Sequence, residues 1–324
     1  MKQLLVIMTL ISMVLAGCGP QQPPNEAGST TTQPPQVETE ASPAAADTQA
    51  PVAPAEEESE ASLTVGVMPK LVGIDFFNAT EKGAKEAGAE LGVDLVYDGP
   101  ATNDVQKQIE MIETWISRGF DAIAVAPNDP DAIVPVLEDA RAEGITVVTW
   151  DADAAPSARD YFANQCTSAS VAKALMDTLA RNAGEDANYV FITGSLTAAN
   201  QNIWMAEMEK YRQERYPDMT NLSPEPKVSE EDQALATQVT TDVLKVYPDL
   251  DGILAITSVA LPGAAEAVRA AGAADQVFLT GLATPNVMRE YVKDGTVKEF
   301  VLWNAVDLGY LAVQVAVAAT TGEL

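Results

Sequence analysis

Residues 63–98 read LTVGVMPKLVGIDFFNATEKGAKEAGAELGVDLVYD. The apolar run at the start predicts a β-strand, and the apolar residues spaced three and four apart after it predict an amphipathic helix. A second apolar run at 94–97 predicts another strand. This strand–helix–strand unit is the first of a series, so it determines how the rest of the chain is interpreted.

The loop between the first strand and its helix, residues 68–77, carries polar and aromatic side chains. Lys70, Asp75, Phe76 and Phe77 lie just past the carboxyl end of the predicted strand. Open parallel sheets bind small ligands at the carboxyl ends of their strands. We therefore expect this loop to open a cleft for a sugar-sized molecule.

Runs of Val, Ile and Leu at 122–126 and 145–149 continue the alternation, and helix-length segments separate them. In one such segment, Ile109, Ile112 and Ile116 recur at helical spacing. Each crossover helix must bury its apolar side on the sheet. The pattern therefore predicts an α/β fold with a parallel sheet covered by helices on both faces.

The regularity stops at residues 152–165, where no clear helix is expected, and a second series follows. It predicts helices at 167–182, 201–216, 231–246, 262–271, 285–293 and 308–320, and strands at 188–193, 252–256, 277–282 and 297–303. The chain therefore holds two similar halves. Two facing α/β lobes enclose a cleft, and we expect the chain to cross between them, as a hinge, near 159–165 and 303–307.

The series divides the folded part into two lobes. We expect residues 63–162 together with 305–324 to form the first lobe, and residues 163–304 to form the second. Each lobe is expected to be a doubly wound parallel sheet flanked by helices.

The first 17 residues belong to neither lobe. Their apolar run is too short to span a membrane permanently, which indicates an export signal peptide. The sequence LAGC at 15–18 resembles the lipobox of bacterial lipoproteins and implies cleavage before Cys18 and a lipid on its thiol. The alternative is an ordinary signal followed by an accidental cysteine.

Residues 18–62 are rich in Pro, Gln, Thr, Ala and Glu, with eight acidic residues and no basic ones. Such a segment cannot bury enough apolar surface to offset the entropy of ordering it, so we expect a disordered tether. The alternative is a cleaved propeptide. With a lipid on Cys18, the protein would be anchored to the outer face of the cytoplasmic membrane, or lie in the periplasm.

Composition excludes several classes of function. The 324-residue chain has 47 acidic and 19 basic residues, a formal charge of −28, which would repel nucleic acid. It has no histidine, the commonest general base and zinc ligand, and neither a nucleophile elbow nor a phosphate-binding loop. We expect a monomeric binding protein without enzymatic activity, cofactor or metal. If Cys18 is lipidated, Cys166 has no partner for an intramolecular disulfide.

Polar residues at several strand ends are candidates for ligand binding. Lys70 suits hydroxyl or carbonyl oxygens, although a solvated loop lysine is the simpler interpretation. Asp151 can accept hydrogen bonds from two adjacent hydroxyls, or it can serve as a cap or turn residue, for which Asp153 is better suited. The amides of Asn200 and Gln201 both donate and accept, and Asn200 also fits a plain helix N-cap.

Aromatic and small residues complete the candidate site. Phe76, Phe77 and Trp204 can stack on the C–H faces of a sugar ring, with core packing as the alternative. Pro262 and Ala264 would contribute backbone polar groups and a small surface. Asp307 either reaches the cleft or caps the last helix.

Several stretches carry a family resemblance: PKLVGIDFF, ELGVDLVYDGP, VTWDAD, ANQNIW, ALPGAA, TPNVM and GTVKEFVLWN. Residues 63–324 resemble the periplasmic sugar-binding proteins of the ribose type, most closely the autoinducer-2 receptors that feed an ABC importer. The resemblance implies a two-lobed periplasmic-binding-protein type I fold, a partner permease and a site whose residues match Lys70, Asp151, Gln201, Pro262 and Ala264. Relatives continue past the last helix, which leaves open whether the chain is a fragment.

One position departs from that pattern. Asn200 stands where those receptors have an aspartate, which removes a charge and adds two donors. We expect an extracytoplasmic solute-binding lipoprotein that captures a small sugar-like ligand by hinge closure, with autoinducer-2 favoured. Rhamnose, ribose or another monosaccharide, and a role as a ligand-loaded sensor docking on a signalling receptor, remain alternatives.

Overall fold

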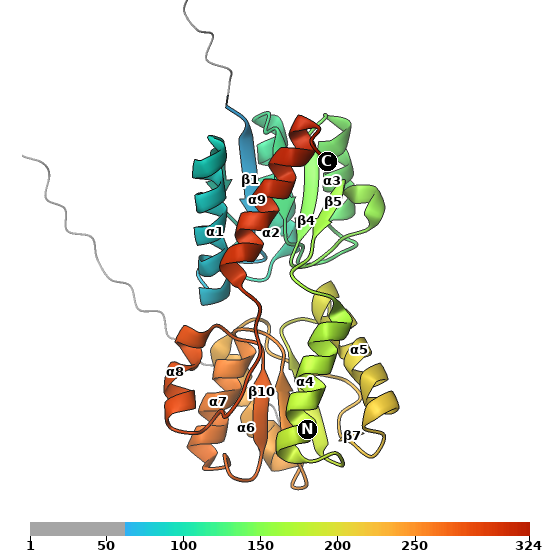
Figure 1. Cartoon of the computed structure of the whole chain (residues 1–324), viewed down its shortest axis with the longest axis vertical. Helices are drawn as coiled ribbons and strands as arrows, with labels where there is room; N and C mark the ends of the chain where they lie inside the picture. Colours follow the sequence, from blue (N-terminus) through green and yellow to red (C-terminus); the bar gives the residue numbers. More distant parts are fainter. Residues whose placement is uncertain (1–61) are drawn as a thin grey trace, which may run out of the picture. The chain divides into compact units, whose positions relative to one another are not determined.

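Two parallel five-stranded sheets form the framework of residues 62–324, the part of the chain that a computed structural model describes (Figure 1). The predicted signal peptide, Cys18 and all but the last residue of the predicted tether lie outside the described residues. The first sheet has the order β2-β1-β3-β4-β5. The second has the order β10-β9-β6-β7, with β8 also pairing with β6. All pairings between these strands are parallel.

The first sheet and its helices form the first lobe. Its strands are β1 (Thr64–Met68), β2 (Asp94–Tyr97), β3 (Ala122–Val125), β4 (Thr146–Trp150) and β5 (Tyr161–Ala163). Its helices are α1 (Asp75–Leu91), α2 (Val105–Ser117), α3 (Val134–Ala142) and, from the end of the chain, α9 (Ala305–Thr321). A 3-10 helix at Pro156–Ala158 precedes β5.

The second sheet and its helices form the second lobe. Its strands are β6 (Asn188–Thr193), β7 (Thr220–Asn221), β8 (Lys227–Val228), β9 (Gly252–Ala255) and β10 (Phe278–Gly281). Its helices are α4 (Ser168–Ala183), α5 (Ala199–Arg215), α6 (Gln233–Val246), α7 (Ala260–Ala271) and α8 (Pro285–Lys293). Within the described part of the chain, no helix is both long and apolar enough to cross a membrane.

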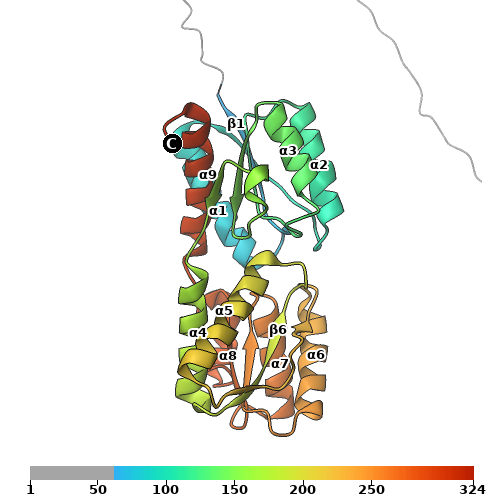
Figure 2. The ribbon, with the colours of Figure 1, turned by 90° about the vertical axis from the view of Figure 1, so that its right-hand side faces the viewer.

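Each sheet is buried on both faces, as its continuous apolar strands require. In the first lobe, α1 and α9 cover one face of the sheet and α2 and α3 cover the other (Figure 2). Val65 and Val67 pack against α1 and α9, while Ile123 and Val125 pack against α2 and α3. The second sheet is divided in the same way, with α4 and α5 on one face and α6, α7 and α8 on the other. The predicted alternation of strands and helices is therefore confirmed.

Some predicted elements were wrong. In the described part of the chain, residues 297–303 do not form the expected strand. This segment leaves the second sheet to reach α9, and it pairs with the sheet only through one bridge, from Leu282 to Val301. Conversely, β5 lies within residues 152–165, where no clear helix was expected and no strand was predicted. At three residues, β5 is too short to show a periodic pattern. Helix α1 begins at Asp75, so Phe76 and Phe77 lie in its first turn rather than in a loop.

Two glycines allow α9 to pack closely on α1. A Cβ atom on Gly83 would overlap the backbone oxygen of Val306, and one on Gly309 would overlap the backbone oxygen of Thr80. The last helix therefore packs on the first lobe with its backbone nearly in contact with that of α1.

This close packing gives a stability prediction. Gly83→Ala should lower the free energy of unfolding by about 1–3 kcal/mol, because the added methyl group overpacks the helix contact. A glycine-to-alanine change within an uncrowded helix is expected instead to raise it by roughly 0.5–1 kcal/mol. Urea denaturation of the two proteins distinguishes these signs, and a gain in stability would contradict the proposed contact.

Candidate ligand-binding site

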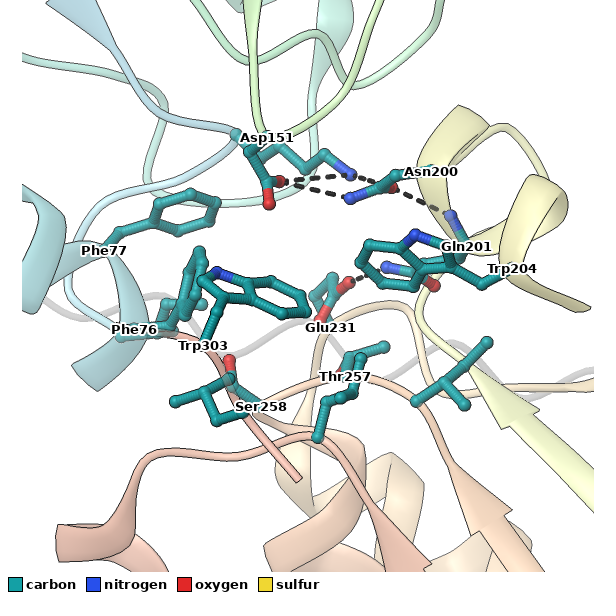
Figure 3. A pocket seen from close by; sticks show the side chains of 15 residues that line it. Phe76, Phe77, Asp151, Asn200, Gln201, Trp204, Glu231, Thr257, Ser258 and Trp303 are labelled. Carbon is teal, nitrogen blue, oxygen red and sulfur yellow. Dashed lines mark hydrogen bonds and ion pairs between the residues drawn. The ribbon is translucent and has the colours of Figure 1, made fainter. Parts of the chain in front are cut away.

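A pocket lies where the carboxyl ends of strands from both sheets meet, and its cavity has a volume of about 50 Å³. Ligand pockets in proteins have volumes of roughly 300–1,000 Å³, so a sugar-sized ligand requires the two lobes to move apart around it. Its lining comes from both lobes (Figure 3): Lys70, Ile74, Phe76, Phe77, Asp151, Asn200, Gln201, Trp204, Glu231, Ile256, Thr257, Ser258, Leu282, Leu302 and Trp303. Seven of the ten predicted ligand-binding residues are thus brought together at one place.

A buried ion pair of the first lobe is linked to the second lobe by an amide. The Lys70 ammonium donates to Oδ1 of Asn200 at 2.8 Å and lies 3.9 Å from Oδ2 of Asp151. The Asn200 amide in turn donates to Oδ2 of Asp151 at 3.3 Å. Lys70 and Asp151 are 5% and 4% exposed, so the interpretation of Lys70 as a solvated loop residue is wrong.

Both the burial of the Asp151 carboxylate and the backbone conformation of this residue cost free energy. Burial raises the pKa of Asp151 to about 6, although the Lys70 charge lowers it, and the nearby Glu231 raises it further. Its backbone has φ of 60°, a left-handed conformation that is unfavourable for residues other than glycine and is found mainly where function or packing requires it. The Gln165 amide donates to its Oδ1 at 3.2 Å.

A buried glutamine holds the loop that carries Lys70. Gln108 of α2 donates to the carbonyl oxygens of Pro69 and Ala126 and accepts from the backbone N–H of Asn128 at 2.9 Å. The Asn128 amide then donates to the carbonyl of Lys70 at 2.8 Å. These hydrogen bonds fix the backbone from which the Lys70 side chain extends into the pocket.

The amides at the start of α5 have different partners. The N-cap of this helix is Ala198, so the alternative in which Asn200 is a plain N-cap is wrong. The Gln201 oxygen accepts from the backbone N–H of Gly194 at 2.7 Å and from the Thr193 hydroxyl. Its Nε2 donates to Oε1 of Glu231 at 3.0 Å.

Aromatic rings form the apolar part of the pocket. Phe76 packs edge-to-face on Phe77 with ring centroids 5.1 Å apart, and Trp303 lies between Phe76 at 5.9 Å and Trp204 at 5.5 Å. The indole N–H of Trp303 is buried and finds no acceptor among the residues that the structure describes. It is therefore available to an acceptor on a ligand.

Three of the predicted residues do not line this pocket. Pro262 and Ala264 lie in α7 and are buried, with Ala264 in the core between α7 and the second sheet. Asp307 is exposed in the first turn of α9. The assignment of Pro262 and Ala264 to the site rests on the sequence resemblance, and that of Asp307 on its place at the predicted second crossing.

Sequence reasoning missed several lining residues. Glu231 lies in an acidic stretch, residues 229–232, that carries no recognisable motif. Thr257 and Ser258 follow β9, and their position just after a strand end was the available signal. Trp303 was assigned to the end of a strand and the start of the second crossing between the lobes, but it was not among the predicted ligand-binding residues. No group of three or more potential metal ligands occurs within residues 62–324.

A search of known sequences finds relatives along the whole of this two-lobed unit. A family model described as periplasmic binding protein domain matches residues 65–324. The D-ribose/D-allose-binding protein of Pseudomonas aeruginosa is 26% identical over 286 residues, which cover 84% of this chain and 87% of that protein.

Solved structures of solute-binding proteins are also similar to this chain. LsrB from Clostridium saccharobutylicum in complex with AI-2 is 30% identical, with a TM-score of 0.77 over 80% of this chain and 82% of its own. A solute-binding protein of an ABC transporter from Clostridium phytofermentas, with bound L-rhamnose, is 28% identical, with a TM-score of 0.78 over 81% of this chain and 83% of its own. The predicted two-lobed fold is thereby confirmed, and the chain belongs to the periplasmic binding protein domain family.

Proposed function

We propose that this protein is the solute-binding component of an ABC importer and captures a small, uncharged, sugar-like molecule. One observation carries the proposal: polar groups from both lobes, Lys70 with Asp151 and Asn200 with Gln201, meet in one pocket beside aromatic rings. Hydrogen-bonding groups for hydroxyls and flat apolar faces for ring C–H groups are what a sugar requires. The named relatives are binding proteins for transport, which supports a role without catalysis.

Autoinducer-2 is the favoured ligand. The AI-2 complex of LsrB and the L-rhamnose complex are similar to this chain to almost the same degree, so overall similarity does not choose between their ligands. Preference for autoinducer-2 rests on the sequence stretches that surround Lys70, Asp151 and Gln201. Ribose, as in the Pseudomonas aeruginosa relative, is the second candidate.

Capture would involve closure of the two lobes. The chain passes from β5 to α4 and returns through the segment before α9, so two connections join the lobes. A ligand that bonds to Asp151 and Gln201 at once stabilises only the arrangement in which both face it. Its binding energy therefore shifts the population toward the closed form that a permease recognises.

The N-terminal features extend this proposal. A lipid on Cys18 and a tether over 18–62 would keep a monomeric receptor beside the importer in the membrane, on the extracytoplasmic side. A receptor that docks on a signalling protein would use the same pocket and tether. Reconstitution with the permease, followed by ligand uptake, distinguishes the two roles.

Calorimetric titration of the full chain tests the ligand. We expect saturable binding of autoinducer-2 in borate-free buffer, and weaker binding of L-rhamnose and D-ribose. Binding of either sugar without binding of autoinducer-2 would contradict the ligand and leave the receptor function standing. Failure of all three to bind would remove the support for the sugar-like class.

A further inference from the structure

We propose that Glu231 is a second ligand-binding carboxylate, and that together with Asp151 it restricts the pocket to uncharged or cationic ligands that donate hydrogen bonds at both ends. This inference rests on the proposed binding function and specifies its ligand class. It also changes the role of Gln201, which becomes the residue that positions Glu231.

The contacts of Glu231 leave acceptor capacity directed to a ligand. Its side chain lines the pocket and accepts one hydrogen bond, from Nε2 of Gln201, at 3.0 Å. Among residues 62–324 it forms no ion pair with a lysine or arginine, whereas Asp151 is paired with Lys70. An ionised carboxylate accepts about four hydrogen bonds, so most of its capacity is unused.

The backbone at Glu231 has a conformation that costs conformational free energy. Glu230 and Glu231 have φ values of 51° and 53°, so two successive residues other than glycine are left-handed. Such conformations cost free energy and persist where the surrounding structure fixes them, often at binding sites. The loop is fixed at both sides, by Ser229 on the Thr193 carbonyl and by the Asp232 side chain, which caps α6.

The facing strand end leaves room for the carboxylate. A Cβ atom on Gly194 would overlap Oε1 of Glu231, so only glycine at that position admits the observed side chain. The same Gly194 donates its N–H to Gln201, the residue that holds Glu231. The Glu231 carboxylate is thus held in place by the left-handed backbone at 230–231, by the space at Gly194 and by the hydrogen bond from Gln201.

The charge balance of the pocket then defines the ligand class. Among the described lining residues, Lys70 is the only cation, and Asp151 and Glu231 are the two acids. Lys70 is already engaged by Asn200 and Asp151. A phosphate or carboxylate on a ligand would meet a second carboxylate and no free cation, whereas hydroxyl or ammonium groups find an acceptor on each lobe.

A matched pair of variants tests the assignment. Glu231→Gln and Glu230→Gln each remove one charge from the same left-handed turn, but the Glu230 side chain is exposed and does not line the pocket. For autoinducer-2, L-rhamnose or D-ribose, whichever the wild type binds, we expect Kd to rise at least 10-fold in Glu231→Gln and less than 2-fold in Glu230→Gln. Equal Kd values in the wild type and Glu231→Gln would overturn the proposal.

D-ribose 5-phosphate tests the exclusion of anions. We expect at least 100-fold weaker binding of the phosphorylated sugar than of D-ribose to the wild type, and a smaller ratio in Glu231→Gln. Equal binding of the two compounds by the wild type would contradict the proposal while supporting the binding function itself. Circular dichroism of each variant establishes that it is folded.

A measurement without ligand separates this inference from the proposed function. Carbon-13 NMR of the carboxyl groups should show a lower pKa for Asp151 in Glu231→Gln, because a neighbouring negative charge is lost, and no change in Glu230→Gln. If the wild type binds none of the three ligands, the proposed function fails, and this comparison still decides whether the two carboxylates face one another. An unchanged Asp151 pKa in Glu231→Gln would overturn the inference.

Discussion

Replacing Lys70 by methionine is expected to lower the free energy of unfolding by about 3–5 kcal/mol at pH 8, because it leaves the buried Asp151 carboxylate without its cation. Methionine keeps much of the length and the apolar stem of lysine, so packing is largely retained. Within residues 62–324 no other lysine or arginine pairs with Asp151, whose remaining donors are the neutral amides of Asn200 and Gln165. Urea denaturation at several pH values measures the loss.

The loss should depend on pH in a defined direction. The pKa of Asp151 is already raised above its ordinary value of 3.8, to about 6, so the stability linked to this group is fully present below about pH 4 and is lost as the pH rises through 6. Removal of Lys70 takes away the charge that lowers this pKa. The deficit of Lys70→Met should therefore be large at pH 8 and nearly absent at pH 4, where Asp151 is protonated in both proteins.

A double variant provides the control. Lys70→Met combined with Asp151→Asn removes both charges, so it should recover most of the stability that Lys70→Met loses at pH 8. It should not recover ligand binding, since both charged groups are gone. A deficit of Lys70→Met that is independent of pH and is not relieved by Asp151→Asn would show that lysine acts through packing and not through charge.

The strand and helix pattern was predictable because burial on both faces of a parallel sheet requires continuous apolar runs. Strand β6 and helix α8 have the bounds expected from the sequence. The very short strands β5, β7 and β8 were missed, since two or three residues carry no periodicity. The segment 297–303 was assigned to a strand because its apolar content matches one, but the crossing between lobes determines its path.

The site was predictable only in part, and the reason is physical. Lys70, Asp151 and Asn200 lie at the ends of strands or the start of a helix, where topology alone predicts a binding edge. Glu231 and Trp303 lie in irregular segments whose course depends on tertiary contacts, such as the absence of a Cβ atom on Gly194. Gln108, on the buried side of α2, shows the same limit, because its role depends on backbone groups 18 and 39 residues away in the chain.

Replacing Asp151 by asparagine is expected to weaken ligand binding by at least 100-fold. The carboxylate can accept from two hydroxyls at once, and each hydrogen bond to a charged group contributes roughly 1.5–3 kcal/mol. Asparagine replaces one acceptor by a donor and leaves the other neutral, so both bonds are affected and the expected loss exceeds the 2.7 kcal/mol or so that corresponds to 100-fold. Asparagine has nearly the same shape and tolerates the left-handed backbone that Asp151 adopts. Isothermal titration at pH 8, where the wild-type group is ionised, measures the effect.

Asp153→Asn is the matched control, because this carboxylate lies two residues away in the same loop but outside the pocket. Asp153 pairs with Arg159 at 2.6 Å and accepts from the backbone of Ala154, so its loss should lower stability while leaving Kd within about 2-fold. The wild-type affinity should also fall as the pH drops below 6, since protonated Asp151 accepts fewer hydrogen bonds, and Asp151→Asn should lack this dependence. Equal losses of affinity in the two variants would mean that the loop is perturbed as a whole and that Asp151 does not contact the ligand.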